Sequence, residues 1–197
     1  EDAHGWLFIA FELLDGRSVE EELASRGPMP ASRVASIAAD ALAALEEAHA
    51  MGIVHRDLKP ANIFLARTPE GDRVKVLDFG IAKSTNPGTL AGLTQMGAAM
   101  GTPIYMAPEQ LLGKQVSPAS DVFAMGIVLA DMALAVSPYG ADPQLLTVIT
   151  DRIDGKPVPI PPPLAGTPLG DIVARATSPD PAKRFGSAAE MRSALLA

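Results

Sequence analysis

An apolar run over residues 120–136 constrains the fold more than any other feature of this sequence. Hydrophobic residues lie on nearly every side of the helix that this run would form, which predicts a helix surrounded by other elements. Helical spacing of apolar residues also predicts amphipathic helices over 30–51, 145–153, 169–176 and 187–196, which can supply that cover. The chain is therefore predicted to be mostly α-helical, with a core built around residues 120–136.

The first half of the chain adds a small β component. Residues 6–14 are almost continuously apolar and predict one buried strand, which a turn at Asp15-Gly16 would end. A short helix is expected over residues 19–25. Short apolar stretches on either side of the turn sequence at 68–72 predict a hairpin. The fold class expected from these elements is α+β, mostly α.

Two segments lack a periodic pattern. Residues 83–101 are rich in Gly, Ala, Ser and Thr, and predict a long loop, a kind of segment that often carries function. Residues 156–168 are rich in proline and predict an extended surface connector rather than a peptide ligand for another protein. A length of 197 residues fits one domain.

Composition excludes several classes of protein. Sixteen Lys and Arg against 23 Asp and Glu give a net charge of −7, which argues against a general nucleic-acid partner. Because cysteine is absent, disulfide bonds and cysteine-ligated zinc are excluded. The sequence contains no run long enough for a membrane-spanning helix and no signal peptide. A first residue of Glu rather than Met leads us to expect a piece of a longer chain.

The chemistry concentrates in residues 55–62, which read HRDLKPAN. This stretch lies between a predicted helix and a predicted hairpin, and Asp78 follows 16 residues after Asn62, at the end of an apolar strand. Two carboxylates, an amide and the ammonium of Lys59 are suited to binding Mg²⁺ and phosphate oxygens. A single imidazole nearby does not suit zinc.

Three motifs in order carry a family resemblance. HRDLKPAN at 55–62, DFG at 78–80 and APE at 107–109 resemble the catalytic loop, the metal-binding motif and the substrate-loop anchor of protein kinases. The resemblance covers nearly the whole chain. Lys59-Pro60 and GTPIY at 101–105 resemble serine/threonine kinases, and the stretches DFGIAK, GTPIYMAPEQ and DPAKRFGSAAEM resemble those of bacterial receptor type. The resemblance implies a protein-kinase-like fold: residues 1–14 as the last small-lobe strand and hinge, 15–197 as the large lobe, and 78–109 as the activation segment.

The resemblance also implies a reaction and its residues. ATP would donate its γ-phosphate to a protein Ser or Thr hydroxyl, with Asp57 as the catalytic base. Asn62 and Asp78 would hold Mg²⁺, or Mn²⁺ in its place. Lys59 would contact the transferred phosphoryl group, and Thr102 would hydrogen-bond Asp57 and Lys59.

Adenine binding is implied at the start of the chain. Phe11 would be the gatekeeper, while Glu12 and Leu14 would offer backbone groups to the base. Phe64 and Leu77 would form the floor of the pocket, although spacing alone would make them ordinary core residues.

Other implied roles are structural or regulatory. Glu109 and Arg184 would form a buried ion pair, the alternative being a weak surface bridge. Asp121 would cap its helix, bond the catalytic-loop backbone, or do both. Arg56 implies control by phosphorylation, with Thr94 as the first candidate acceptor and an ordinary loop threonine as the alternative. Outside the motifs, His49 is expected to be a packing residue. The remaining motif residues with structural roles are His55, Phe79 and Gly80.

The sequence departs from the family in two places, of which the stretch 132–143 is only a weaker match and the start of the chain is the larger departure. The glycine-rich loop, the strand lysine and its glutamate partner, expected before residue 6, are absent from the sequence. We therefore expect either a fragment of an active kinase, with little activity alone, or a non-catalytic scaffold made of a lone large lobe. Intact Asp57, Asn62 and Asp78 favour the fragment. The expected partners are protein substrates, and autophosphorylation and a kinase dimer are further expectations. The expected location is the cytoplasm, the alternative being the cytoplasmic domain of a membrane-anchored kinase.

Overall fold

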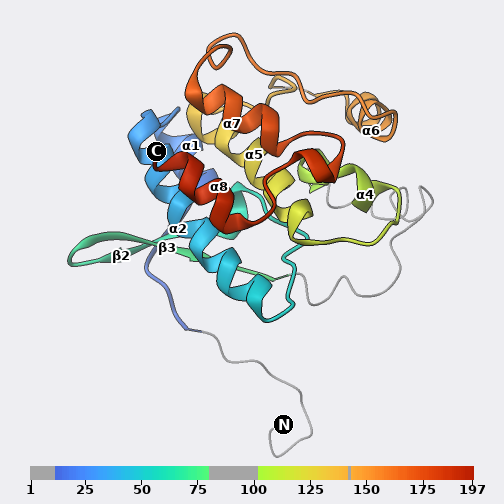
Figure 1. The fold of residues 1–197 in the computed structure, drawn as a ribbon. Helices are drawn as coiled ribbons and strands as arrows, with labels where there is room; N and C mark the ends of the chain where they lie inside the picture. The colour runs from blue at the N-terminus through green and yellow to red at the C-terminus, as the bar shows by residue number, and fades with distance from the viewer. Residues whose placement is uncertain (1–11, 80–101, 142) are drawn as a thin grey trace, which may run out of the picture.

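The computed structural model describes residues 12–79, 102–141 and 143–197, and shows a group of helices with a small sheet at one side (Figure 1). The remaining residues lie outside the description. The helices are α1 (Val19–Arg26), α2 (Ala31–Ala50), α4 (Pro108–Leu111), α5 (Pro118–Leu134), α6 (Leu145–Ile153), α7 (Pro168–Ala176) and α8 (Ala188–Leu195). The strands are β1 (Gly16–Ser18), β2 (Ile63–Thr68) and β3 (Gly71–Val76), and the 3₁₀ turns are η1 (Pro60–Asn62), η3 (Thr102–Tyr105) and η4 (Pro181–Lys183).

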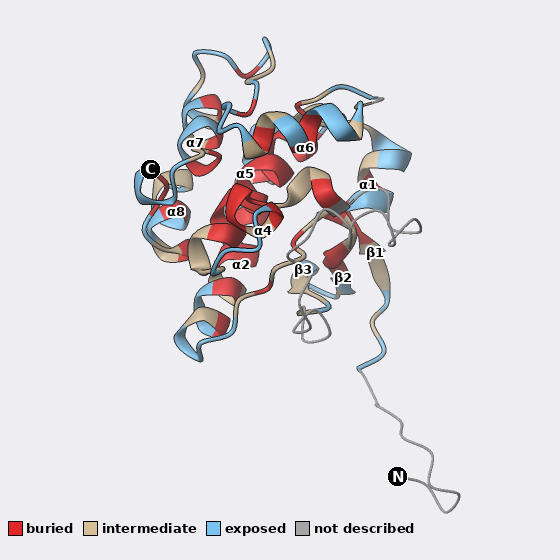
Figure 2. Ribbon diagram, turned by 90° about the vertical axis from the view of Figure 1, so that its right-hand side faces the viewer, coloured by how far each residue is buried: buried red, intermediate tan, exposed pale blue. Residues whose placement is uncertain are grey.

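Helix α5 is the centre of the core, which confirms the main expectation from the sequence. Every residue from Ser120 to Met132 is buried, and the helix contacts α2, α7 and α8 (Figure 2). Gly126 allows α7 to approach closely, because an added Cβ would lie 2.7 Å from Thr177 Cγ2. The helix starts at Pro118 rather than at Ser120, since proline suits the first helical position. It ends at Leu134, before Ala135 takes a left-handed conformation.

The other long helices lie close to their expected bounds. Helix α2 runs from Ala31 to Ala50 and buries one face, including Leu42 and Leu45, against the core. Helix α1 starts with a capping box in which the Glu21 backbone N–H donates to Ser18 Oγ (3.1 Å) and the Ser18 N–H donates to Glu21 Oε2 (2.7 Å). Single-turn elements η1, η3, η4 and α4 were not expected, because they are too short for a periodic pattern.

The sheet is antiparallel in the order β1-β2-β3. Ile63 pairs with Val76 and Thr68 with Gly71, so the expected hairpin around residues 68–72 is confirmed. The predicted turn at Asp15-Gly16 is wrong at its second residue, since Gly16 starts β1 and pairs with Ala66. A side chain could not fit there, because an added Cβ would lie 2.1 Å from the Leu65 carbonyl oxygen. Residues 12–14 form no strand, and residues 6–11 of the predicted strand lie outside the description.

The proline-rich connector over 156–168 is more than a surface segment, which corrects the expectation. Val158 and Leu164 are buried, at 4% and 6% exposure. The Leu164 carbonyl accepts hydrogen bonds from the N–H and hydroxyl of Thr167, the N-cap of α7 (3.1 and 2.8 Å). Gly170 lies against the same carbonyl, where an added Cβ would be 1.9 Å away. The predicted loop over 83–101 lies outside the described residues.

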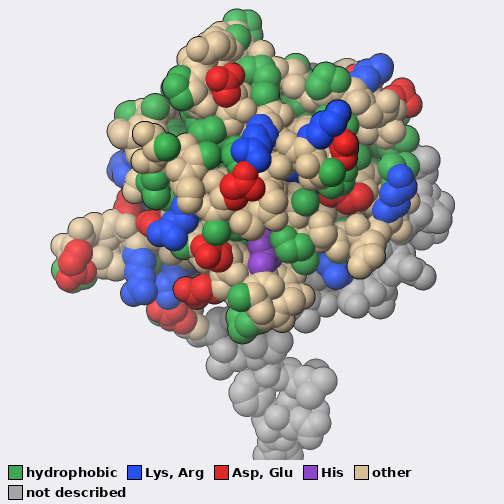
Figure 3. All heavy atoms as spheres, in the orientation of Figure 1, with side chains coloured by type: hydrophobic (Ala, Val, Ile, Leu, Met, Phe, Trp, Pro, Cys, Tyr) green, Lys and Arg blue, Asp and Glu red, His purple; other side chains and the backbone are tan. Residues whose placement is uncertain are grey.

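Acidic and basic side chains are interspersed on the face that carries α7 and α8, without a patch of one sign (Figure 3). Within the described ranges, no helix is both long and apolar enough to cross a membrane.

Candidate active site

The HRDLKPAN segment forms a tight loop between α2 and β2. Asn62 donates from Nδ2 to the Asp57 carbonyl oxygen (2.8 Å), and its backbone N–H donates to the Lys59 carbonyl (2.9 Å). Lys59 Nζ lies 3.3 Å from Asp57 Oδ2. The loop therefore brings together the carboxylate, the ammonium and the amide that the sequence singled out. Asn62 is buried at 6% exposure, so its side chain is fixed in this position.

Asp121 of α5 holds the start of this loop. Its Oδ2 accepts from the His55 N–H (2.8 Å) and from His49 Nε2 (2.8 Å), and its Oδ1 accepts from the Arg56 N–H (2.9 Å). Both carboxylate oxygens are thus hydrogen-bonded to the HRDLKPAN loop and to α2. The N-cap of α5 is Ser117 rather than Asp121, so of the two expected roles the structure shows the bonds to the loop backbone. Arg56 has a left-handed backbone (φ 67°), an unfavourable conformation for a side-chain-bearing residue that these contacts stabilise.

His55 joins the loop to the end of β3. Its ring is fully buried, accepts at Nδ1 from the Asp57 N–H (3.2 Å) and bonds through Nε2 to the Leu77 carbonyl (2.8 Å). Since a carbonyl only accepts and a backbone N–H only donates, Nε2 acts as the donor and Nδ1 as the acceptor. The ring also packs on Phe79 at 4.7 Å between centroids. These contacts give His55 a structural role within the motif.

Asp78 lies beside Asn62. The Leu77 N–H donates to the Asn62 carbonyl (2.9 Å), which extends the β2–β3 pairing by one step and brings the two motifs together. Asp78 is exposed and has a left-handed backbone (φ 53°). Among the described residues, no group of three or more His, Cys, Asp or Glu side chains could hold a metal ion. One amide oxygen and one carboxylate nevertheless fit Mg²⁺, which commonly takes few protein ligands together with substrate phosphates.

The segment after η3 is tied to the catalytic loop from the other side. Gln110 donates from Nε2 to the Arg56 carbonyl (2.8 Å), and its Oε1 accepts from the Ala107 N–H (3.0 Å). The predicted ion pair is present and bidentate: the two terminal nitrogens of Arg184 lie 2.7 and 2.9 Å from the oxygens of Glu109. The Arg184 side chain is fully buried, so the alternative of a weak surface bridge is excluded.

The Glu109–Arg184 pair is also fully hydrogen-bonded. Arg184 donates its other hydrogens to the carbonyls of Ser178, Ala119 and Pro179, and Glu109 accepts from Ser120 Oγ (2.7 Å). Burial alone raises the pKa of Glu109, but the hydrogen bonds from Arg184 and Ser120 outweigh it and keep the pKa below its ordinary value. The carboxylate therefore stays charged under ordinary conditions.

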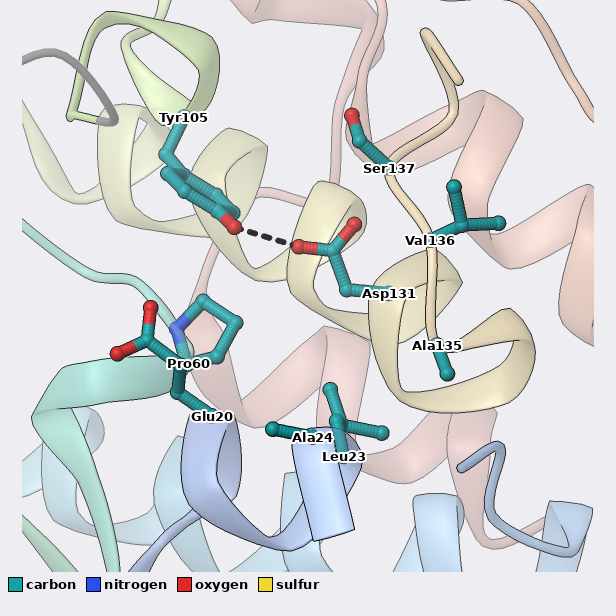
Figure 4. Close-up of a pocket in the computed structure, with 9 residues that line it drawn as sticks. All are labelled: Glu20, Leu23, Ala24, Pro60, Tyr105, Asp131, Ala135, Val136 and Ser137. Carbon is teal, nitrogen blue, oxygen red and sulfur yellow. Dashed lines mark hydrogen bonds between the residues drawn. The ribbon is translucent and has the colours of Figure 1, made fainter. Parts of the chain in front are cut away.

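A pocket adjoins the catalytic loop on the side of α1 and the end of α5 (Figure 4). Pro60 lines the pocket next to the loop, and Glu20 and Leu23 line it from α1. Tyr105 and Asp131 line it as a hydrogen-bonded pair. Tyr105 donates its hydroxyl hydrogen to Asp131 Oδ2 (2.6 Å). Burial raises the pKa of Asp131 to about 7, although the Tyr105 hydrogen bond lowers it.

The residues expected to bind adenine are only partly described. Glu12 is exposed and pairs with Lys75 (2.8 Å), and Leu14 is half-buried. Phe64 and Leu77 are half-buried and do not belong to the buried core, so their reading as ordinary core residues is not supported. Three expected residues, Phe11, Gly80 and Thr94, lie outside the described residues, and so does the side chain of Thr102.

Sequence reasoning missed several contacts near the site. His49 is more than a packing residue, since it hydrogen-bonds Asp121. Its position on the helix just before the catalytic loop was the only signal in the sequence. Tyr105 and Asp131 are 26 residues apart, and no spacing rule links them. A fully buried arginine at the end of α6, Arg152, also went unnoticed.

Comparisons with known proteins identify the family of the chain. The profile of the protein kinase domain matches residues 2–194. Serine/threonine-protein kinase pkn3 of Myxococcus xanthus is 38% identical over 204 residues, which cover 98% of this chain and 36% of pkn3. PknB of Mycobacterium leprae is 36% identical over 191 residues, which cover 96% of this chain and 30% of PknB. The chain thus spans about a third of the length of these relatives.

A solved structure gives the same fold. The PknI kinase domain of Mycobacterium tuberculosis superposes with a TM-score of 0.66 at 24% identity, over 94% of this chain and 63% of that one. The helix-rich architecture with its small sheet is accordingly a protein kinase fold. Members of this family use ATP and a divalent metal, and act on protein substrates. This chain belongs to the protein kinase domain family and is similar to bacterial serine/threonine-protein kinases.

Proposed function

We propose that the chain is the large-lobe part of a bacterial-type serine/threonine protein kinase, which transfers the γ-phosphoryl group of ATP to a protein hydroxyl. One observation supports this proposal: Asp57, Lys59 and Asn62 share one tight loop, and Leu77, the residue before Asp78, donates its backbone N–H to the Asn62 carbonyl. Such an arrangement suits phosphoryl transfer, because catalysis of this reaction consists mainly of positioning and charge stabilisation.

Each residue then has a distinct task. Asp57 orients the acceptor hydroxyl and takes its proton on the carboxylate. Lys59, 3.3 Å from that carboxylate, contacts the phosphoryl group during transfer. Asn62 uses Nδ2 to hold the Asp57 carbonyl, which leaves its amide oxygen to bind metal together with Asp78. The metal, Mg²⁺ or Mn²⁺, offsets negative charge on the phosphates when bound.

The neighbouring motifs support Ser and Thr as acceptors. Lys59-Pro60 and the GTPIY sequence at 101–105 are of the serine/threonine type, and Thr102 would hydrogen-bond Asp57 and Lys59. Arg56, which precedes the catalytic Asp, would pair with a phosphate on the activation segment, and Thr94 is our candidate acceptor. Autophosphorylation within a kinase dimer is one way to place that phosphate. Such a reaction would take place in the cytoplasm, where ATP is available.

The alternative is a non-catalytic scaffold. We favour a fragment of an active kinase because a scaffold would not need the intact catalytic set of Asp57, Asn62 and Asp78. The relatives also extend well beyond the matched region. On this proposal, the 197-residue chain alone transfers phosphate poorly, and the activity belongs to the longer protein that contains it.

The test is phosphate transfer from radiolabelled ATP to a mixed Ser/Thr peptide library by the full-length protein. Asp57→Asn should lower kcat by about 10²–10⁴-fold, the usual contribution of a general base. Asp171→Asn, an exposed change on α7, is the control and should leave the rate unchanged. Label on Ser or Thr that disappears with Asp57→Asn supports the proposal. An unchanged rate in Asp57→Asn contradicts the role of Asp57, and no transfer by any form supports the scaffold.

A further inference from the structure

Arg152 is the largest fully buried side chain among the described residues, and the phosphoryl-transfer chemistry gives it no task. It lies in the last turn of α6 at 2% exposure. Burying a guanidinium removes it from water at a large cost, which a carboxylate partner usually offsets. No carboxylate of the described residues forms an ion pair with Arg152, in contrast to the other buried arginine, Arg184.

Uncharged oxygens satisfy Arg152 instead. Nη1 donates to the Met106 carbonyl, and Nη2 donates to the Ile104 carbonyl (3.2 Å) and to the Tyr139 hydroxyl. The guanidinium carbon also lies 4.6 Å from the ring centroid of Phe123 and 5.5 Å from that of Tyr139. Aromatic faces attract a cation, so the pocket replaces part of the lost hydration.

The two carbonyls lie at the end of a single 3₁₀ turn and just after it. Ile104 belongs to η3, while Met106 and Ala107 connect η3 to α4 and form no helix or strand ladder of their own. The Met106 N–H donates to the Pro103 carbonyl (3.2 Å), and the Ala107 N–H donates to Gln110 Oε1 (3.0 Å). A planar guanidinium can donate to the carbonyls of residues i and i+2 at once, whereas an ammonium is a point charge without a fixed fork.

This stretch is held from two sides. While Arg152 holds the carbonyls on either side of Tyr105, the Tyr105 hydroxyl itself is held by Asp131. Gln110, in the following helix α4, donates to the Arg56 carbonyl of the HRDLKPAN loop. The backbone of residues 104–107 is therefore coupled to that loop on one side and to α6 on the other.

We propose that Arg152 is a positioning residue for substrate binding, which clamps the backbone of Ile104 and Met106 so that the segment before α4 presents a fixed surface to the protein substrate. The proposal rests on the proposed function in one respect: a kinase that phosphorylates proteins must hold the acceptor peptide, and the proposal assigns part of that surface to residues 104–107. Arg152 is too buried to touch a substrate itself and acts only through the two carbonyls.

Two measurements on the full-length protein test the clamp. The first is amide hydrogen exchange at Met106 and Ala107, whose N–H groups both have acceptors. Arg152→Met keeps the apolar stem and removes the donors, so exchange at these two amides should accelerate by about tenfold or more, the effect of lost charge-assisted hydrogen bonds. Arg152→Lys keeps the charge but loses the fork, and should accelerate exchange less.

The second measurement is steady-state kinetics with a peptide selected from a Ser/Thr library. KM for the peptide should rise about tenfold in Arg152→Met, while kcat and KM for ATP stay within about twofold, since only peptide binding loses its surface. Arg192→Met makes the same change at an exposed position in the last turn of α8 and should alter neither readout.

The outcomes separate this proposal from the proposed function. If no form of the protein transfers phosphate, the proposed function fails, and local acceleration at Met106 and Ala107 still supports the clamp. Acceleration spread equally over α2 and α5, or a fall in kcat with unchanged peptide KM, overturns the positioning role. If Arg152→Met does not fold, Tyr139→Phe is the second variant, because it removes one acceptor of Arg152 and keeps the two carbonyl contacts. It should raise the exchange rates at Met106 and Ala107 and the peptide KM by less than Arg152→Met would. Unchanged exchange rates and peptide KM in Tyr139→Phe would overturn the proposal.

Discussion

Two aspartates at opposite ends of α5 have nearly the same burial but very different surroundings. Asp121 is 1% exposed and Asp131 is 5% exposed. Asp121 accepts hydrogen bonds on both oxygens, from two backbone N–H groups of the catalytic loop and from His49. Asp131 accepts one, from the Tyr105 hydroxyl, and its Oδ1 is buried without a hydrogen-bond partner in the described structure.

The number of donors decides what a buried carboxylate can do. With three donors, the Asp121 carboxylate has hydrogen bonds on both oxygens and holds the HRDLKPAN loop in place. With one donor, Asp131 is poorly compensated, and burial raises its pKa to about 7. The burial of Tyr105 raises the pKa of its hydroxyl, and the nearby Asp131 carboxylate is a second cause. One helix thus carries a fully hydrogen-bonded carboxylate at the end next to the HRDLKPAN loop and a group that titrates near neutrality at its other end.

Replacing Asp121 should have the largest effect. Asp121→Asn turns one acceptor oxygen into an NH₂ group that faces donors, so it should lower the free energy of unfolding by about 3–5 kcal/mol, as when a buried charge loses its partner. The left-handed backbone of Arg56 would lose its support, and phosphate transfer should fall as well. Urea unfolding followed by circular dichroism measures the stability.

The matched control is Asp40→Asn on the exposed face of α2, which should change stability by less than about 0.5 kcal/mol. Equal stability of the two variants would contradict the anchoring role of Asp121. Loss of activity without loss of stability would limit that role to the geometry of the loop.

Glu109 extends the comparison to a buried carboxylate with a charged partner. A double-mutant cycle of Glu109→Gln and Arg184→Met should give a coupling free energy of about 2–3 kcal/mol, because each single change strands the other group. The folded pKa of Glu109 is lowered, so this stabilisation is present above about pH 4.5 and is lost as the pH falls below it. Additive effects of the two changes would show that the pair is not coupled.

The stability that Asp131 contributes should change with pH in the direction opposite to that of Glu109. The folded pKa of Asp131 is raised from 3.8 to about 7, so the native state holds a proton that the unfolded state has released between these values. Stability from this group therefore falls as the pH rises from about 4 to 7. Asp131→Asn keeps an acceptor for Tyr105 and should remove that slope, with a gain of about 1–2 kcal/mol at pH 8, limited by its own unpaired NH₂.

Melting temperatures at pH 5 and pH 8 measure this slope. The difference between Asp131→Asn and wild type should be larger at pH 8 than at pH 5. The same difference at both values would show that Asp131 does not change its protonation in this range.

Local patterns predicted most of the helices, and tertiary contacts explain what they missed. The sequence placed α6 at its observed bounds and α2 within a residue, because apolar periodicity and flanking Gly or Pro act locally. Strand β1 has three residues and is created by its pairing with β2, so no local signal existed. Buried Val158 likewise depends on a core formed by distant elements.

The candidate site divides in the same way. Contiguous motifs revealed Asp57, Asn62 and Asp78, and family resemblance supplied the Glu109–Arg184 pair, whose members are 75 residues apart. Arg152 carries no motif, because two of its three hydrogen-bond acceptors are backbone carbonyls that any sequence would provide. Contacts of side chains with distant backbone leave no residue-type signature, so a single sequence could not reveal them.

His49 provides the finest test of the comparison between the two aspartates. The sequence favoured a packing residue, and packing alone predicts that His49→Leu is tolerated, since the side chain is 9% exposed and lies on α2. In the structure His49 supplies one of the three donors to Asp121. Its loss should therefore lower the free energy of unfolding by about 1 kcal/mol, the net value of one hydrogen bond.

The decisive comparison is His49→Leu in two backgrounds, wild type and Asp121→Asn. If His49 acts through Asp121, the change should cost less in the second background, because the carboxylate that it served is already gone. If His49 only packs, the cost should be equal in both. A cost confined to the wild-type background would show that His49 stabilises the protein through its hydrogen bond to Asp121. The number of hydrogen-bond donors would then account for the difference between Asp121, which has three, and Asp131, which has one.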